Sequence, residues 1–374
     1  YGRKRIIYLG LIIFALGSGV AALADSIWGV ILGRALQGGG AVSAAVMALA
    51  ADLTREEHRI KVMATIGITI GLSFAVSMIL GPVLNGWIGV PGIFWLTGLF
   101  ALLSIAVVRF QVPNPVLSRV HRDAEPVASQ FGRVLADTQL LRLNFGIFIL
   151  HLLLTATFVA VPLALRDAGL PSQQHWEIYL PALLFSMAAI IPFIIIAEKY
   201  HQLKPVFLGA ILTLALTEFG LLTLHDSVLE MSGLLLLFFT GFNLLEATLP
   251  SLIAKMAPPD AKGTAMGVYS SSQFLGAFAG GALGGWLRGL AGLKGVFAFA
   301  MLGALAWLLV AWTMKNPRAL SSYLLNVGVI DEAAAHHLAL QLAQVPGVAE
   351  AVVIATDGVR SEERRVGKEC RLLC

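Results

Sequence analysis

Four ionisable side chains lie inside long apolar runs of this sequence: Arg34, His151, Glu218 and Glu246. A charged or titratable group in hydrocarbon is costly, so such a residue usually faces a protein interior or a water-filled cavity. Guanidinium, imidazole and carboxyl groups in such a cavity can bind, steer and exchange ions or protons. The four residues are therefore candidates for ion or proton handling within a membrane.

Arg34 lies within the run from Trp28 to Asp52, and Gln37 falls on the same helical face three residues later. At ~1.5 Å per residue, Arg34 is about 11 Å from the outer end of the run, deeper than a snorkelling side chain prefers. We expect Arg34 and Gln37 to face a central cavity. The alternative is an arginine that reaches the membrane interface.

Glu246 shares one helical face with Asn243 and Pro250, at spacings i, i+3 and i+7. A carboxyl group beside a cavity inside a membrane can take up and release protons, so we expect Glu246 to be the proton-exchanging residue. The alternative is a neutral acid that is hydrogen-bonded between helices.

Glu218 and His151 are weaker candidates for the same cavity. Glu218 lies within one to two turns of the outer end of its run, where a side chain can also reach the lipid headgroups. His151 shares a face with Asn144 and Thr155, although a single histidine in an apolar run is more often a packed, hydrogen-bonded group.

The composition indicates a membrane protein that crosses the bilayer many times. The 374 residues are 57% hydrophobic and 13% charged, with a mean hydropathy of +0.82, whereas soluble domains carry about 25% charged residues. The net charge of +4 is spread between apolar runs, so no nucleic-acid partner is expected. No nucleophile–base pair, phosphate-binding loop or metal-ligand spacing occurs in the sequence, which predicts no enzyme, no metal site and no cofactor.

Ten runs are long enough to span a bilayer, and their continuous rather than alternating hydrophobicity predicts helices. They cover residues 6–24, 27–51, 62–85, 92–110, 143–165, 177–198, 205–224, 229–254, 264–287 and 293–314. When the loops are assigned to alternate sides, one side receives 17 Lys and Arg residues and the other receives three. The first side, which also receives the C-terminus, is therefore predicted to be cytoplasmic.

The loops also divide the chain. A polar, basic linker at 112–142 separates four helices (1–111) from six (143–316), and GPVLNGWI at 81–88 is echoed by GGALGGWL at 280–287. Two six-helix halves would require two further helices before Tyr1. Residues 317–359 read as strand (323–330), helix (331–344) and strand (349–356), a partial α/β module similar to ferredoxin-like metal carriers but without their Cys-x-x-Cys. Residues 360–374, which hold Cys370 and Cys374, resemble an in-frame translation of a sequencing adapter.

Three motifs resemble signatures of the major facilitator superfamily. Gly2, Arg3 and Lys4 match the loop signature that follows the second helix, and LGRALQGGGA at 32–41 matches the Arg-x-x-Gln-Gly-x-Gly signature of the fourth helix. Gly81-Pro82 with Gly86 is similar to the antiporter signature of the fifth helix, with Asn85 in place of one glycine. The resemblance extends over residues 1–316.

This resemblance implies an all-α, two-bundle fold with ten of twelve transmembrane helices, in the bacterial inner membrane. It implies that Arg34 orients a proton-coupling site and that Gly2, Arg3 and Lys4 form a cytoplasmic latch with Asp52; the alternative is a set of solvated surface charges. By their types and spacing, Gly81 and Pro82 are expected to break their helix and act as a hinge, and Gly280 and Gly284 to pack helices closely.

We therefore expect a monomeric transporter that moves a small solute, with protons as the coupled ion and the proton gradient as its energy source. Proton-driven efflux or antiport by alternating access is the expected mode. The alternatives are an uncoupled facilitator, and a membrane receptor or assembly protein that acts through residues 317–359.

Overall fold

The computed structural model describes residues 3–40, 42–54, 56–113, 130–200, 202–258, 261–315, 322–326, 332–343, 345, 350–353 and 369–373. The chain divides into two compact units, Tyr1–Lys315 and Asn316–Cys374, and each is described by itself. The first unit is helical and contains the residues that could handle ions.

The N-terminal part of the first unit is a bundle of four helices: α1 (Arg3–Ala22), α2 (Ile27–Gly39), α3 (Ser43–Asp52) and α4 (Glu56–Phe110). The Ser26 hydroxyl accepts a hydrogen bond from Gly29 N and so caps the start of α2. A side chain at Gly17 or Gly33 would collide with backbone atoms of the facing helix. These glycines let α1 and α2 approach backbone to backbone.

The run 27–51, expected as one helix, is divided between α2 and α3. Gly40 ends α2, and its N–H donates to the carbonyls of Leu36 and Gln37. Gly40 also lies against Gly10 O and Phe14 of α1, so any side chain there would collide with that helix. The close contact between α1 and the end of α2 explains why the residue at this point is glycine.

Helix α4 is two helices joined by a reversal at Gly89. Its 55 residues would extend about 80 Å if straight, far more than the ~30 Å of a bilayer core. Gly89 has φ 65° and ψ 176°, a backbone conformation that is essentially restricted to glycine. Gly292, with φ 67° and ψ −163°, makes the equivalent reversal in α10 (Lys262–Trp312).

The expected break at Gly81-Pro82 is wrong, because α4 continues through both residues and its non-helical interior residue is Gly89. Proline keeps a helical φ, and helices in membranes tolerate the backbone bond that it removes. The ideal Cβ positions of Gly81 and Gly86 meet no atom within 4 Å, so neither glycine is a close helix contact in the described part of the chain.

The C-terminal part of the first unit has a buried aromatic and aliphatic core that includes Phe207, Phe238, Phe239 and Trp307. The carboxylate of Asp137 caps the helix that begins at Thr138 by accepting from Gln139 N and Leu140 N. The elements of this part are α5 (Phe131–Ala136), α6 (Thr138–Asp167), the 3-10 turn η2 (Ser172–Gln174), α7 (Trp176–Lys199), α8 (Leu203–Thr223), α9 (Val228–Met256) and α10.

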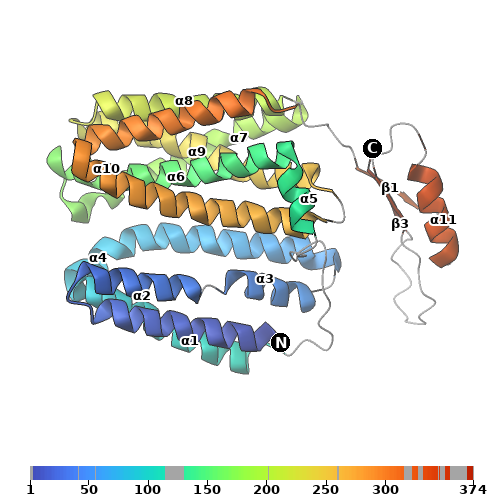
Figure 1. The fold of residues 1–374 in the computed structure, drawn as a ribbon, viewed down its shortest axis with the longest axis horizontal. Helices are drawn as coiled ribbons and strands as arrows, with labels where there is room; N and C mark the ends of the chain where they lie inside the picture. Colours follow the sequence, from blue (N-terminus) through green and yellow to red (C-terminus); the bar gives the residue numbers. More distant parts are fainter. Residues whose placement is uncertain are drawn as a thin grey trace. The chain divides into compact units, whose positions relative to one another are not determined.

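Helix α10 packs along α6 through a stripe of glycines. Side chains at Gly276, Gly280 and Gly284 would meet Phe148, Leu152 and Ala156 respectively, so the two helices run side by side in the same direction. Figure 1 shows α10 folding back, with one arm beside α6 and the other beside α8.

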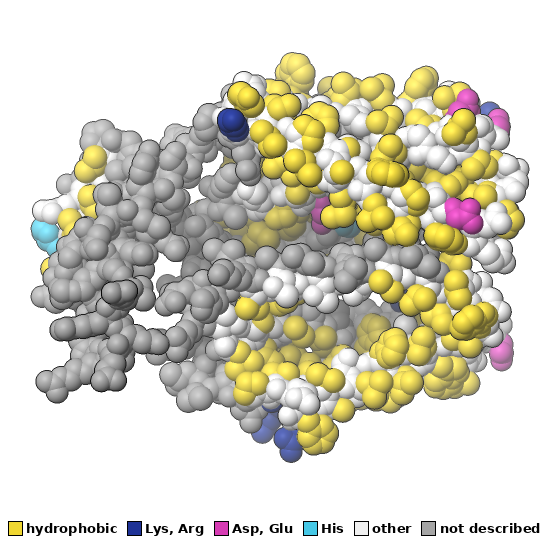
Figure 2. All heavy atoms as spheres, turned by 180° about the vertical axis from the view of Figure 1, so that it is seen from behind, with side chains coloured by type: hydrophobic (Ala, Val, Ile, Leu, Met, Phe, Trp, Pro, Cys, Tyr) yellow, Lys and Arg dark blue, Asp and Glu magenta, His cyan; other side chains and the backbone are white. Residues whose placement is uncertain are grey.

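Seven helices among the described residues are long and apolar enough to cross a membrane. Figure 2 shows hydrophobic side chains over much of the described surface. Large apolar side chains such as Leu216, Phe219, Leu309 and Trp312 are exposed. The chain is therefore a multi-pass membrane protein. The predicted count of ten spans differs from these seven helices because the elements do not match the predicted runs one to one. Helices α4 and α10 each cover two predicted runs, and the run 27–51 is divided between α2 and α3. The count of ten of twelve spans therefore stays a prediction.

The second unit contains β1 (Ser322–Asn326), α11 (Glu332–Ala343), β2 (Glu350–Val353) and β3 (Glu369–Leu373). The strand order is β1-β3-β2, and both pairs are antiparallel. Strand β3 lies in the segment that resembles an adapter translation. A ferredoxin-like fold remains a prediction, because these elements alone do not specify it.

Candidate functional site

Three side chains from three helices meet inside the C-terminal bundle: His151 of α6, Glu246 of α9 and Gln273 of α10. Gln273 Nε2 lies 2.8 Å from His151 Nε2 and 3.3 Å from Glu246 Oε1. His151 Nε2 is also 3.9 Å from Glu246 Oε2. We call His151, Glu246 and Gln273 the polar cluster.

The polar cluster is mostly enclosed but not sealed. The His151 side chain is 13% exposed and that of Glu246 is 37% exposed, and the ring of Phe242 lies 5.7 Å from the His151 ring. Glu246 Oε2 and His151 Nδ1 have no hydrogen-bond partner among the described residues. These two atoms are themselves buried, so the cluster has unused hydrogen-bonding capacity in its interior.

The Gln273 amide can hydrogen-bond to His151 and Glu246 both when these two groups are deprotonated and when they are protonated. Because the amide nitrogen only donates, Gln273 in this arrangement donates to an unprotonated His151 Nε2 and to the Glu246 carboxylate. If both of those groups gained protons, the amide could turn its oxygen to accept instead. Gln273 can thus bridge the protonated and the deprotonated pair.

Asn243 and Glu246 share a helix face but contact different helices. Asn243 Nδ2 donates to Ser186 Oγ of α7 at 2.8 Å, and Ser186 is fully buried. The bond connects α9 to α7 beside the polar cluster. Pro250 lies within α9, which continues as a helix to Met256.

Glu218 lies apart from the polar cluster. Its side chain on α8 is completely buried, and Thr157 Oγ1 of α6 donates to Glu218 Oε1 at 2.6 Å. A reach toward the lipid headgroups is therefore wrong for this residue. Asn144, expected beside His151, is 5% exposed, and its amide atoms have no partner among the described residues.

Arg34 belongs to a second polar network, in the N-terminal bundle. Arg34 Nη1 donates to Gln37 Oε1 at 2.6 Å, and Gln37 Nε2 donates to Ser18 Oγ of α1 at 2.6 Å. Thr97 of α4 lies 3.4 Å from the same hydroxyl. Arg34 itself is exposed, whereas Gln37 is 3% exposed and Ser18 fully buried, so the network runs from the surface into the α1–α2–α4 interface.

The expected latch is only partly within the described residues. Gly2 and the side chain of Asp52 lie outside them, and Arg3 is the first residue of α1. Lys4 Nζ donates to the backbone carbonyl of Val112, just after α4, so it connects the start of α1 to the end of α4.

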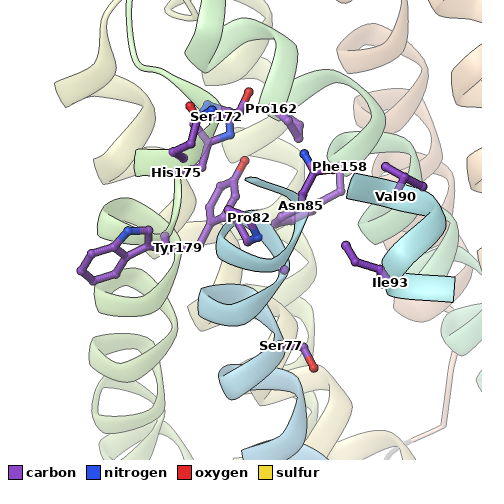
Figure 3. Close-up of a pocket in the computed structure, with 13 residues that line it drawn as sticks. Ser77, Pro82, Asn85, Val90, Ile93, Phe158, Pro162, Ser172, His175 and Tyr179 are labelled. Carbon is purple, nitrogen blue, oxygen red and sulfur yellow. The ribbon is translucent and has the colours of Figure 1, made fainter. Parts of the chain in front are cut away.

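A cavity of about 530 Å³ lies between α4 and the α6–η2–α7 segment (Figure 3). On the α4 side it is lined by Ser77, Gly81, Pro82, Asn85, Val90 and Ile93; on the other side by Phe158, Pro162, Ser172, Gln173, His175, Trp176 and Tyr179. We call this space the α4–α7 cavity. Gly81 and Pro82 are among its lining residues, and their role as a hinge stays a prediction.

Sequence reasoning did not identify Gln273, Ser18 or Thr97. A usable signal existed for Gln273, because steps of three, four and four residues lead from it to Gly276, Gly280 and Gly284 on the face that packs against α6. No group of three or more His, Cys, Asp or Glu in the described part of the chain could hold a metal ion.

The family profile described as Major Facilitator Superfamily matches residues 1–244 and 143–329 of the chain. The chain is 46% identical over 352 residues to the inner membrane transport protein YajR of Escherichia coli K12, covering 94% of this chain and 77% of that protein. It is 26% identical over 340 residues to the multidrug resistance protein MdtH of Enterobacter sp. strain 638, covering 88% and 82%.

Among solved structures, a bacterial homologue of the human lysosomal transporter Spinster, inward-facing and occupied, superposes with a TM-score of 0.65. The match covers 84% of this chain and 82% of that structure at 11% identity, so it supports the fold alone.

Proposed function

The chain belongs to the major facilitator superfamily, and from this we propose that it is a secondary active transporter that exports a small solute in exchange for protons. Membership of this family makes it a membrane transport protein rather than an enzyme. Proton coupling, the direction of transport and the residues that perform the coupling are our proposals.

The observation that carries the proposal is the polar cluster. A carboxyl group and an imidazole are held by one amide where three helices meet, and the carboxyl side chain is one-third exposed. Ionisable groups inside a membrane protein are costly and commonly belong to proton or ion pathways. The close contact between α6 and α10 is made by glycines rather than by these ionisable groups.

We propose that protons load the cluster in one arrangement of the bundles and leave it in the other. Protonation of His151 Nε2 would remove one acceptor that Gln273 now serves, and protonation of Glu246 would weaken the other and add a donor, so both changes favour rotation of the Gln273 amide. Because α6, α9 and α10 each contribute one residue, this change would alter contacts among three helices at once. A solute can shift the same equilibrium only if it binds the two arrangements with different affinities.

Export and an inner-membrane location are supported by the names of the relatives. MdtH is named a multidrug resistance protein and YajR an inner membrane transport protein. The excess of Lys and Arg on one side of the predicted spans supports a cytoplasmic C-terminus. A monomer that uses the proton gradient needs no bound cofactor.

The proposal can be tested with purified protein in lipid vesicles that carry an imposed pH gradient. A pH-sensitive dye reports whether neutral, anionic or cationic aromatic solutes dissipate the gradient. For the wild type we expect at least one solute to do so. The substitution Glu246→Gln removes the exchangeable proton and keeps the shape, and it should reduce this dissipation at least tenfold.

The matched control is Glu230→Gln, an exposed glutamate in the first turn of the same helix, which should behave as the wild type. Unchanged dissipation in Glu246→Gln would contradict coupling through Glu246. Solute movement without any effect on the pH gradient would favour an uncoupled facilitator. The comparisons give no support to a receptor or assembly protein that acts through residues 317–359.

A further inference from the structure

A buried tyrosine lies one helical turn from the polar cluster. Tyr269 of α10 precedes Gln273 by four residues, so the two side chains share one face of the helix. Tyr269 is 3% exposed, and its hydroxyl has no hydrogen-bond partner among the described residues. The hydroxyl is close enough to the Glu246 carboxyl group for the two to interact electrostatically. Tyr269 is therefore a neighbour of the cluster that the hydrogen bonds of the cluster do not use.

The Tyr269 hydroxyl and Glu246 Oε2 are complementary. A phenol hydroxyl both donates and accepts hydrogen bonds, and an ionised carboxyl oxygen accepts them. Glu246 Oε2 is also buried and without a partner among the described residues, because Gln273 bonds to Oε1 instead. Buried polar atoms that make no hydrogen bond are unfavourable. A contact between this donor and this acceptor, direct or through one water molecule, would satisfy both.

A third group without a partner lies on the neighbouring helix α6. Asn144 is 5% exposed, and neither its Nδ2 nor its Oδ1 has a hydrogen bond among the described residues. It lies four residues before Phe148, whose backbone meets Gly276 of α10, and Tyr269 lies seven residues before that glycine. Both residues are thus on the faces where α6 and α10 touch, at levels about 4.5 Å apart along the helices. A buried water molecule makes about three hydrogen bonds, and this amide supplies a donor and an acceptor for one.

Tyr269 and Asn144 lie on the same side of the polar cluster. Asn144 precedes His151 by seven residues in α6, Tyr269 precedes Gln273 in α10, and the two helices run in the same direction. Both residues therefore lie between the cluster and the ends at which α6 and α10 begin (Figure 1). The distribution of Lys and Arg among the loops predicts that these ends are cytoplasmic. A proton exchanged between Glu246 and the cytoplasm along these helices would pass both residues.

The neighbouring helices carry few other charged residues at this level. Those toward the same end of α5, α6 and α8 are exposed, on another face of their helix, or bonded to the end of α10: respectively Arg133, Arg142 and Lys204. The side chains of Lys255 and Lys262 lie outside the described residues. Glu246 of α9 and His151 of α6 are the described ionisable groups beside the face of α10 that holds Gln273 and Tyr269.

We propose that the Tyr269 hydroxyl relays protons between Glu246 and water held at Asn144. To load Glu246, a hydronium ion gives a proton to the phenol oxygen while the phenol gives its own proton to Oε2, so the tyrosine ends unchanged. Discharge is the reverse: protonated Oε2 donates to the phenol oxygen, and the phenol proton passes to water. The inference rests on the proposed function, because Glu246 is the group that is loaded, and it extends that function by naming the route.

The first test detects the contact between the hydroxyl and the carboxyl group without any solute. Infrared difference spectra between low and high pH, recorded on the full-length protein in lipid nanodiscs, show the C=O stretch of protonated carboxyl groups. The band that Glu246→Gln removes belongs to Glu246. We expect Tyr269→Phe to move this band to higher frequency, because a carboxyl group with fewer hydrogen bonds has a stiffer C=O bond. The control Tyr200→Phe, at an exposed tyrosine directly after α7, should leave it in place.

The second test measures transport in vesicles with 1-naphthamide, 1-naphthoate and 1-naphthylmethylammonium, and continues with the solute that the wild type exchanges for protons fastest. We expect Tyr269→Phe and Asn144→Leu to lower the initial rate of gradient-driven transport at least fivefold. Exchange of labelled for unlabelled solute should stay within about threefold of the wild type. The pH at half-maximal rate should also stay that of the wild type, because a relay changes how fast Glu246 is loaded and not how tightly it holds the proton. A residue that only positioned Glu246 would move that pH.

The relay is overturned if the infrared band does not move in Tyr269→Phe, if this variant transports at the wild-type rate, or if the pH at half-maximal rate moves. Loss of solute exchange in Tyr269→Phe would show a structural role and would also overturn it. Wild-type rates in Asn144→Leu would contradict the water at that amide. If Glu246→Gln abolishes gradient-driven transport and Tyr269→Phe does not, the proposed function stands and the relay fails. A wild type without gradient-driven transport removes both, although an infrared shift would still show the contact.

Discussion

Gln273 is the residue on which the polar cluster depends most directly, because its amide lies within hydrogen-bond distance of both ionisable groups. His151 and Glu246 are 3.9 Å apart at their closest recorded atoms, beyond hydrogen-bond distance. Without the amide, each group would lose its hydrogen bond and the two would be free to separate. Gln273 is therefore a positioning residue for the proton-exchanging pair.

The substitution Gln273→Leu should uncouple transport while leaving the bundle folded. Leucine has a similar size but cannot bridge His151 and Glu246, so we expect dissipation of a pH gradient by solute to fall at least tenfold. The neighbouring control is Ser272→Ala, because Ser272 Oγ bonds only to Val268 O of its own helix. Normal coupling in Gln273→Leu would show that the amide does not organise the pair.

The ionisable members of the site were predicted from the sequence and the amide was not, although its spacing from Gly276, Gly280 and Gly284 places it on the face that packs against α6. His151 and Glu246 stand out because titratable side chains in apolar runs are rare. Gln273 follows three serines near the start of a long run, where its polarity does not distinguish it. Glu218 was also a candidate for this site, because it too is an acid within an apolar run. It lies instead in a different part of the bundle, where it accepts a hydrogen bond from Thr157.

At the scale of helices, glycine determines both where helices touch and where they turn. Gly280 and Gly284 face α6 at backbone distance, whereas Gly281 and Gly285 beside them face open space. Neighbouring glycines of α10 thus lie on different faces of the helix, and only the packed set should be sensitive to added bulk.

Replacing Gly280 by leucine should destabilise the C-terminal bundle. The new side chain would meet the Leu152 backbone and the Thr155 hydroxyl, and overpacking of this kind costs about 1–3 kcal/mol or more. The measurement is the thermal unfolding midpoint in detergent, with Gly281→Leu as the matched control that should stay near the wild type. Equal midpoints for the two variants would contradict the packing of α10 on α6.

A second prediction concerns the reversal within α4. Gly89 has a positive φ with an extended ψ, and an alanine there costs about 1–3 kcal/mol. Gly89→Ala should therefore lower the thermal unfolding midpoint. Gly86→Ala is a helical position on the same element and should not lower it, because alanine favours the helix. A midpoint for Gly89→Ala at or above that of the wild type would argue against this reversal.

The long apolar runs were sufficient to predict helices, but not their exact breaks. Proline and glycine at 81–82 suggested a break, whereas α4 turns seven residues after Pro82, at Gly89. The chain reverses at Gly89, which follows the apolar run 62–85 and has a backbone conformation open only to glycine. A proline inside a membrane helix does not by itself produce such a reversal. Periodicity predicts the helix, and the local backbone conformation fixes its end.

At the scale of the first unit, two of the polar networks among the described residues lie in different bundles. The Arg34–Gln37–Ser18 network ties together helices of the N-terminal bundle, and the polar cluster ties together helices of the C-terminal bundle. The α4–α7 cavity is lined by residues of both bundles. A solute in this cavity would contact both bundles, so its binding would depend on their relative position.

If protons are coupled to alternating access at Glu246, the bundles should still move in a variant that cannot exchange a proton there. Glu246→Gln should mimic the protonated, uncharged state of Glu246 permanently, because a glutamine amide does not ionise as a carboxyl group does. Solute could then still cross in exchange for solute, although a proton gradient could no longer drive it.

The most direct test compares counterflow with gradient-driven transport in the same Glu246→Gln vesicles, using a solute that the wild type exchanges for protons. We predict that exchange of labelled for unlabelled solute stays within about threefold of the wild type, while gradient-driven accumulation falls at least tenfold. Loss of both activities together, or retention of both, would contradict the assignment of the coupled proton to Glu246.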